Sequence, residues 1–257
     1  PENIIVEPCR RNTASCIALA TALVKQRCED AVMIVLPADH KITPVKRFQE
    51  DLQDCIEQSY SGNLAVLGVV PDNPVTGYGY ICAGEKIDNG FHKVDSFKEK
   101  PDFETAGKYL ADGNYWWNCG IFIWQTAAII EAFEKFVPEL HKKINHWSQG
   151  GDFRDDFREC PNISIDYAVM EKSDNAVVKQ ASFHWNDIGS WQALYELMVK
   201  DFHGNSVTSN GKVQLQQACS NLVICDDDTE IYIENINTCV IVKSGKSILI
   251  KELEHTS

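Results

Sequence analysis

Two aspartates, Asp39 and Asp187, stand far apart in the chain, and each follows a strand-like segment. Asp39 lies in the loop Pro37-Ala38-Asp39-His40 after an apolar run, and Asp187 lies between two tryptophans at residues 185–191. Ligands of open α/β sheets bind outside the carboxyl ends of the strands. Two carboxylates on separate loops can share one Mg²⁺, which proteins usually hold by one or two carboxylates plus substrate phosphates. The pair therefore indicates metal-dependent chemistry on phosphates.

The turn Glu7-Pro8-Cys9-Arg10-Arg11-Asn12-Thr13 carries an acid and two arginines before a predicted helix. Asn12 or Thr13 alone fits an ordinary helix N-cap, and Asp39 alone fits a turn or helix cap. A carboxylate such as Glu7 can accept two hydrogen bonds from N1–H and the exocyclic amine of guanine. Adenine and uracil lack that pair of donors, so this turn favours guanine.

Three further polar residues have types suited to a phosphorylated sugar. Lys100 offers a point charge to a phosphate, and the neighbouring Glu99 can accept hydrogen bonds from sugar hydroxyls. Asn118 precedes a predicted buried strand, where its amide suits hydroxyl recognition. Each residue alone also fits an ordinary charged strand end or loop, and the segment Ser164–Glu171 also reads as a capped helical turn.

Composition limits the classes of function. The chain has 257 residues and a formal net charge of -13, which argues against a nucleic-acid or anionic-membrane surface. No apolar run approaches membrane-spanning length, and no signal peptide is visible. The 10 cysteines are scattered without a C-x-x-C pair, which predicts reduced thiols in the cytoplasm rather than zinc ligands or a disulfide scaffold.

Strands alternate with helices through most of the chain, which predicts an α/β domain with a mixed, mostly parallel sheet and helices on both faces. After about residue 204 only short strands follow, so we expect domains at 1–204 and 205–257, the second a small β appendage. We expect strands at 3–6, 31–36, 64–69, 78–82, 91–97 and 120–124, and then at 213–215, 222–224, 230–233, 240–242 and 247–250. Helices are expected at 13–26, 45–59, 103–112, 126–147 with a break near Pro138, and 190–199, with a polar loop at 149–159.

Seven segments occur in an order that resembles one family. They are Glu-Pro-x-x-Arg-Asn-Thr-Ala, Leu-Pro-Ala-Asp-His, Thr-Gly-Tyr-Gly-Tyr-Ile, Phe-x-Glu-Lys-Pro-Asp, Trp-Asn-x-Gly-Ile-Phe, Ser-Ile-Asp-Tyr-Ala-Val-Met-Glu-Lys and Trp-x-Asp-Ile-Gly-Ser-Trp. Over about residues 2–205 the chain resembles the mannose-1-phosphate guanylyltransferases of the sugar nucleotidyltransferase superfamily.

The resemblance implies a Rossmann-like nucleotidyltransferase domain with a β-helix-like tail, and a homodimer. It implies the reaction of GTP with mannose 1-phosphate to give GDP-mannose and pyrophosphate, by in-line attack on the α-phosphorus with Mg²⁺ as cofactor. It also implies the residues of the site. These are Asp39 and Asp187 as metal ligands; Glu7, Arg11, Asn12 and Thr13 at the nucleotide; Gly79, Glu99, Asn118, Asp166 and Tyr167 at the sugar; and Lys100 near its phosphate.

Departures from the family pattern leave alternatives open. The chain starts at Pro1, without an initiator Met and without the family's Gly-x-Gly-x-Arg loop and following Pro-Lys, so we expect a native N-terminal segment. Ser15-Cys16 replaces the usual Pro-Ala, and Val75 replaces the usual Glu. A non-catalytic, sugar-nucleotide-binding relative and a nucleotidyltransferase for another sugar or base are the alternatives.

Overall fold

The computed structural model describes residues 3–253, so the outermost residues of the two predicted domains lie outside the described part. Contacts divide the chain into two compact units. Unit 1 comprises Pro1–Ala38 and Ile42–Trp185, and unit 2 comprises Asp39–Lys41 and Asn186–Ser257. The predicted boundary at residues 204–205 falls just before strand β9 (Ser206–Ser209) and stays a prediction. No helix within residues 3–253 is long and apolar enough to cross a bilayer.

Unit 1 is built around a six-stranded sheet in the order β1-β6-β3-β7-β5-β4, with a further pairing between β6 and β4. Because β6 pairs with both β3 and β4, and β7 pairs with both β3 and β5, five of these strands close into a ring. The sheet strands are β1 (Val32–Val35), β3 (Leu64–Val69), β4 (Gly79–Lys86), β5 (Phe91–Lys98), β6 (Tyr115–Gln125) and β7 (Ala176–Gln180). A separate pair joins β2 (Lys41–Thr43) to β8 (His184–Asn186).

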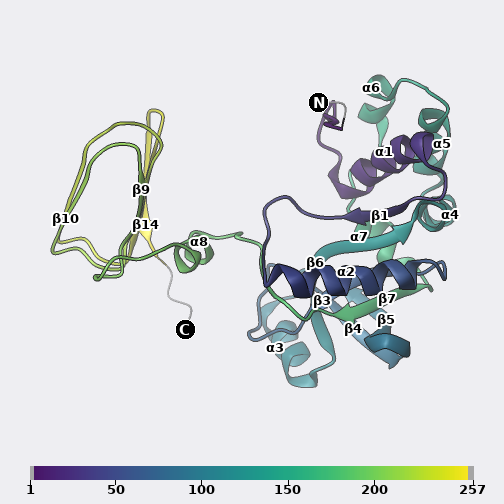
Figure 1. Cartoon of the computed structure of the whole chain (residues 1–257), viewed down its shortest axis with the longest axis horizontal. Helices are drawn as coiled ribbons and strands as arrows, with labels where there is room; N and C mark the ends of the chain where they lie inside the picture. The colour runs from purple at the N-terminus through teal and green to yellow at the C-terminus, as the bar shows by residue number, and fades with distance from the viewer. Residues whose placement is uncertain (1–2, 254–257) are drawn as a thin grey trace. The chain divides into compact units, whose positions relative to one another are not determined.

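Helices cover both faces of the sheet (Figure 1), as predicted. Strand β3 is buried along its length because Val66 faces the cluster under α1, α4 and α5, whereas Ala65 and Leu67 face the cluster under α2. The helices of unit 1 are α1 (Asn12–Arg27), α2 (Val45–Ser59), α3 (Phe103–Asp112), α4 (Thr126–Phe136), α5 (Pro138–Ser148), α6 (Phe153–Asp156) and α7 (Ile165–Ala168).

The mixed α/β fold is confirmed, but the expectation of a mostly parallel sheet is wrong. Strands β3 and β7 form the one parallel pair among the described pairings of this sheet. The reason is the insertion of β6 between β1 and β3. Since β6 runs antiparallel to both, the two strands that the α/β alternation orients alike are not neighbours.

Two local predictions also fail. Residues 3–6 form no strand, and Ile4 and Val6 remain 75% and 77% exposed, because no strand in the described part of the chain pairs with them. The predicted loop at 149–159 contains α6 and the 3-10 turn Phe157–Glu159. Asp152 starts α6 by accepting a hydrogen bond from Arg154 N, and Phe157 anchors the segment because it is fully buried.

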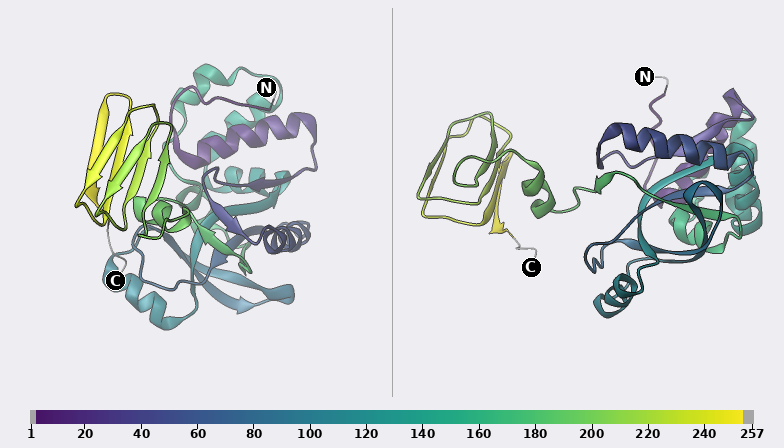
Figure 2. Two further views of the ribbon diagram at one scale, coloured as in Figure 1. Left: turned by 60° about the vertical axis from the view of Figure 1, so that its left-hand side comes forward. Right: turned by 60° about the horizontal axis from the view of Figure 1, so that its bottom comes forward.

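Unit 2 is a β-helix-like stack after α8 (Trp191–Leu197), as predicted, with β9 as an additional strand. Parallel pairing joins β9, β11 and β13 along one side and β10 to β12 along another (Figure 2), and β14 runs antiparallel to β13. The strands after β9 are β10 (Val213–Gln216), β11 (Leu222–Cys225), β12 (Ile231–Glu234), β13 (Cys239–Ser244) and β14 (Ser247–Glu252).

Buried asparagines link successive coils of this stack. Asn221 Nδ2 donates to Asn205 Oδ1 at 3.0 Å and to the Ile236 carbonyl at 2.8 Å, while its Oδ1 accepts from Cys239 N at 3.0 Å. Asn205 and Asn221 are 2% and 0% exposed. Their amides pair backbone groups that would otherwise be buried without a partner.

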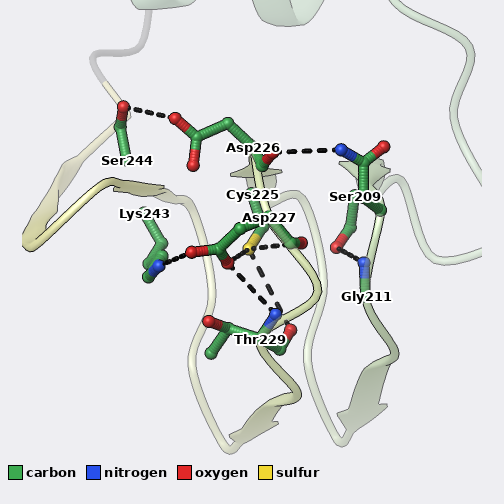
Figure 3. Close-up of polar contacts among 9 residues, drawn as sticks. Ser209, Gly211, Cys225, Asp226, Asp227, Thr229, Lys243 and Ser244 are labelled. Carbon is green, nitrogen blue, oxygen red and sulfur yellow. Dashed lines mark hydrogen bonds and ion pairs between the residues drawn. The ribbon is translucent and has the colours of Figure 1, made fainter.

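The corner after β11 is wider than the corner after β9. Residues 226–230 join β11 to β12, whereas residues 210–212 join β9 to β10. The wider corner is tied down by Asp227, which binds Lys243 and accepts from Thr229 N, and by Asp226, which accepts from Ser244 (Figure 3). Gly211 lies directly against it, because a Cβ there would come within 2.3 Å of the Thr229 carbonyl oxygen.

Candidate active site

Strand β6 places Asn118 between two glycines of neighbouring strands. Gly68 of β3 and Gly79 of β4 are its register partners, so neither neighbour has a side chain beside the Asn118 amide. The sequence reasoning missed Gly68, although a glycine inside a strand often marks a close approach of another group. Other side chains lie over both glycines, because a Cβ at Gly68 would meet Trp116 and Val178 at 3.0 Å and a Cβ at Gly79 would meet Glu99 Oε2 at 2.7 Å.

Asn118 is held in one orientation by two hydrogen bonds. Its Nδ2 donates to Asp166 Oδ1 at 2.7 Å, and its Oδ1 accepts from Gly120 N at 3.0 Å. Ser164 positions Asp166, because its side chain caps α7 by accepting from Tyr167 N. Residues far apart in the sequence thus form one fixed pair in which the amide and the carboxylate keep further polar capacity.

Burial raises the pKa of the Asp166 carboxyl; the hydrogen bond from Asn118 opposes this shift, and the charge of Glu99 adds to it. Burial likewise raises the pKa of Glu171, with Lys98 opposing and the carboxylates of Asp166 and Glu99 adding. Glu171 and Lys98 had not been predicted as site residues. Carboxylates crowded in this way have perturbed pKa values of the kind that cluster at functional sites.

Glu99 reaches this group across Gly79. A Cβ at Gly79 would lie 2.7 Å from Glu99 Oε2, so the glycine is required for the observed position of the carboxylate. Lys100 Nζ lies 3.4 Å from Glu99 Oε1, with its side chain 63% exposed. Tyr167 is 45% exposed, and its ring has no described contact with the group. The structure therefore brings together four of the five predicted sugar-binding residues, with Lys100 beside them.

Three of the four predicted nucleotide-binding residues, Arg11, Asn12 and Thr13, lie at the start of α1. Thr13 Oγ1 accepts from Ile165 N at 2.8 Å, which joins this segment directly to the residue before Asp166. Asn12 has a positive φ of 63°, and its Oδ1 accepts from Thr13 N at 2.8 Å. Arg11 is turned away, because its guanidinium donates to the Arg158 carbonyl.

Glu7 faces a cysteine at the position where the family usually has alanine. Burial raises the pKa of Cys16 to about 12, and the hydrogen bond to the Glu7 carboxylate together with its charge adds to this shift. The thiol therefore stays protonated and can donate to Glu7. This contact occupies part of the acceptor capacity that the sequence reasoning assigned to guanine.

Asp39 and Asp187 both belong to unit 2. Burial lowers the pKa of His40, while the carboxylates of Asp39 and Asp187 act against that shift, so both lie within electrostatic range of the imidazole. Asp187 Oδ1 also accepts from Gly189 N at 3.1 Å. A Cβ at Gly189 would approach Asp187 Oδ2 to 2.8 Å, so this loop needs the glycine for its conformation.

Two carboxylates are a small donor set for a metal. Over residues 3–253, no group of three or more His, Cys, Asp or Glu side chains could hold a metal ion. Mg²⁺ nevertheless takes only one or two carboxylates from a protein when substrate phosphates and water supply the other ligands. The side chains of Asp39 and Asp187 fit that requirement.

Comparisons with known proteins agree with the fold. The nucleotidyl transferase family matches residues 1–203. Mannose-1-phosphate guanylyltransferases of Escherichia coli and Klebsiella pneumoniae are each 37% identical over 99% of this chain, which spans 56% of their length. The crystal structure of a Thermus thermophilus protein, described as a mannose-1-phosphate geranyltransferase, superposes with a TM-score of 0.87 at 30% identity. That likeness covers 97% of this chain and 73% of the other.

Proposed function

The chain belongs to the nucleotidyl transferase family, and from that premise we propose that it transfers GMP from GTP to mannose 1-phosphate, giving GDP-mannose and pyrophosphate. The observation that carries the choice of a sugar substrate is the fixed pair of Asn118 and Asp166 beside Glu99. Full-length relatives named mannose-1-phosphate guanylyltransferase support the choice of guanine and mannose.

In this proposal the amide of Asn118 and the carboxylates of Asp166 and Glu99 bind sugar hydroxyls. Lys100 attracts the sugar phosphate, whose oxygen attacks the α-phosphorus of GTP in line while pyrophosphate leaves. The protein contributes orientation, because reactants held in line avoid much of the entropic cost of a bimolecular step. No covalent enzyme intermediate is required.

Glu7 accepts hydrogen bonds from guanine in this proposal, and Asn12 and Thr13 lie beside the base and ribose. Guanine must compete with the Cys16 thiol for the Glu7 carboxylate. Asp39 and Asp187 would hold Mg²⁺, which would supply positive charge to the phosphate oxygens. We place the reaction in the cytoplasm, on the basis of the scattered cysteines described from the sequence.

The test is pyrophosphate release from GTP with mannose 1-phosphate in Mg²⁺, compared with UTP and dTTP. Turnover with GTP alone supports the proposal, and equal use of the three nucleotides would exclude the guanine assignment. Titration with GDP-mannose, with UDP-glucose as control, distinguishes the enzyme from a non-catalytic protein that only binds sugar nucleotides. Selective binding without turnover would favour the non-catalytic alternative.

Self-association is part of this proposal. Strand β14 lies at the edge of its sheet, and Ile248 and Ile250 are 68% and 61% exposed, which is the surface that supports a homodimer. Apolar edge strands of this kind readily pair with a second copy. Light scattering should give a dimer mass for the wild type and a monomer mass for Ile250→Lys. A wild-type monomer would exclude the dimer.

A further inference from the structure

A cavity of about 310 Å³ opens in unit 1 where β4, β5, β6 and β7 end near the turn at residues 88–90. Figure 1 shows β4, β5 and β7 in this part of the sheet. The walls of the cavity contain none of the residues that the proposed function uses. The polar and aromatic side chains that line it are Lys86, His92, Trp116, Lys179, Gln180 and Ser182.

The chemistry of the walls favours an anion. The polar groups are two ammonium groups, an imidazole, an amide and a hydroxyl, and no carboxylate lines the cavity. This is unusual for a chain that has 37 acidic and 24 basic residues. Lysine binds phosphate as a compact point charge, and concave sites lined by one sign of charge concentrate ions of the opposite sign.

Two of the lining residues are fixed from behind by helix α2. Asp51, which is 3% exposed, accepts from Ser182 N at 2.7 Å and from Ser182 Oγ at 2.9 Å. Lys179 Nζ lies 2.8 Å from Asp54 Oδ2 and 3.6 Å from Asp51 Oδ1. Both residues are therefore positioned before any ligand arrives, as a binding site of low reorganisation cost requires.

The charge of Lys179 is balanced by these aspartates, so the net attraction must come from another residue. Lys86 makes no ion pair with any residue in the described part of the chain, and its side chain is exposed at the rim. Lys86 is thus the group whose charge is available to a ligand.

An aromatic wall completes the cavity. The rings of His92 and Trp116 meet edge to face, with centroids 5.3 Å apart, and His92 Nδ1 lies 3.0 Å from the Gly84 carbonyl oxygen. Trp116 is 6% exposed, so its ring is held in place. The space of about 310 Å³ is more than an isolated phosphate ion fills.

We propose that this cavity binds a small phosphomonoester, with its phosphate near Lys86 and its organic part against Trp116. The site is separate from the proposed sugar-phosphate site, since Lys100 and Asn118 do not line it. It goes beyond the proposed nucleotidyl transfer, and its test requires neither GTP nor Mg²⁺.

The experiment is calorimetric titration with inorganic phosphate and with glucose 6-phosphate, at constant ionic strength, with glucose as the uncharged control. We expect saturable binding of both phosphates and none of glucose. Lys86→Ala should weaken the binding about tenfold, as the loss of one charged contact predicts. Gln180→Ala should weaken it less, because a neutral contact is lost.

Two control variants make the result decisive. Lys93 of β5 lies outside the cavity and pairs with Glu85 of β4, so Lys93→Ala should leave phosphate binding unchanged. Lys100→Ala removes phosphate binding at the proposed sugar site, and the binding that depends on Lys86 should persist in this variant. Binding that survives in Lys86→Ala but disappears in Lys100→Ala would overturn the proposal, as would the absence of saturable binding in the wild type.

Discussion

Asn118 Nδ2 donates a 2.7 Å hydrogen bond to Asp166 Oδ1, and this bond joins β6 to α7. Because the Asn118 amide also accepts from Gly120 N, Asn118→Ala removes the partners of two polar groups. We expect the free energy of unfolding to fall by about 1–3 kcal/mol in urea titrations. Asn175→Ala is the control, since this exposed residue donates only to the Gly62 carbonyl and should cost less. Equal losses would contradict the prediction.

Asp166 should make the stability of the fold depend on pH. Its pKa is raised from the ordinary 3.8, so the folded state holds the proton more tightly than the unfolded chain does. The stabilisation of the folded state by this proton is fully present below pH 3.8. It is lost as the pH rises through the raised pKa of Asp166.

Asp166→Asn removes this titratable group, so its free energy of unfolding should not fall as the pH rises from 3.8 through the raised pKa. We therefore expect the stability of the variant to increase relative to that of the wild type over this pH range. Denaturant unfolding at a series of pH values measures the difference. Asp174→Asn, on the surface, is the control. A difference between Asp166→Asn and wild type that stays constant with pH would show that Asp166 does not titrate as described.

Gly79→Ala should disturb the position of Glu99. The added Cβ would come within 2.7 Å of Glu99 Oε2, which forces the carboxylate to move. We expect KM for mannose 1-phosphate to rise about tenfold or more, because small misplacements at a site are costly. Gly107→Ala in α3 is the matched control, since no atom lies within 4 Å of its Cβ; it should stabilise the helix by about 1 kcal/mol. Unchanged KM in Gly79→Ala would remove Glu99 from the sugar site.

Asp187→Asn should abolish Mg²⁺-dependent turnover while preserving the fold. The asparagine keeps an oxygen that can accept from Gly189 N, so we expect the free energy of unfolding to change by less than about 1 kcal/mol. Initial rates over a Mg²⁺ series provide the measurement. Asp88→Asn, in an exposed turn, should behave as wild type. Wild-type turnover in Asp187→Asn would mean that this carboxylate is not a metal ligand.

Glu7→Gln should make Cys16 more reactive. The Glu7 carboxylate raises the pKa of Cys16 in addition to the effect of burial, so neutralising it favours the thiolate, the reactive form. We expect faster alkylation of Cys16 by iodoacetamide, followed by mass spectrometry of its peptide. Cys28, which is exposed, serves as the internal reference in the same sample. An unchanged ratio of the two rates would show that Glu7 does not act on the thiol.

Periodicity predicted most of the elements, because apolar spacing reports which face of a helix or strand is buried. Helix α2 and the break at Pro138 follow from such local signals. Sheet order does not follow from them. The place of β6 between β1 and β3 depends on pairings between distant segments, and β9 is a polar strand without an apolar signal.

The sequence indicated candidate residues for the site, but not the contacts between them. The type of Asn118 indicated hydroxyl recognition and Asp166 followed from the resemblance to the family, whereas their direct hydrogen bond depends on how α7 packs beside the sheet. In the sequence, Cys16 is recognisable only as a departure from the family pattern. Its contact with Glu7 depends on how the segment before α1 lies against the helix, and residue spacing does not predict that.

The wide corner at residues 226–230 has a consequence for the length of the chain. Leu222 pairs with Ser206, 16 residues earlier, but with Val240, 18 residues later. The strands stay in register, so this corner alone absorbs the two additional residues. Repeats in such stacks contact mainly their neighbours. A short foreign peptide grafted into this corner would therefore extend outward without shifting the register, which makes it a natural place for a fused epitope or label.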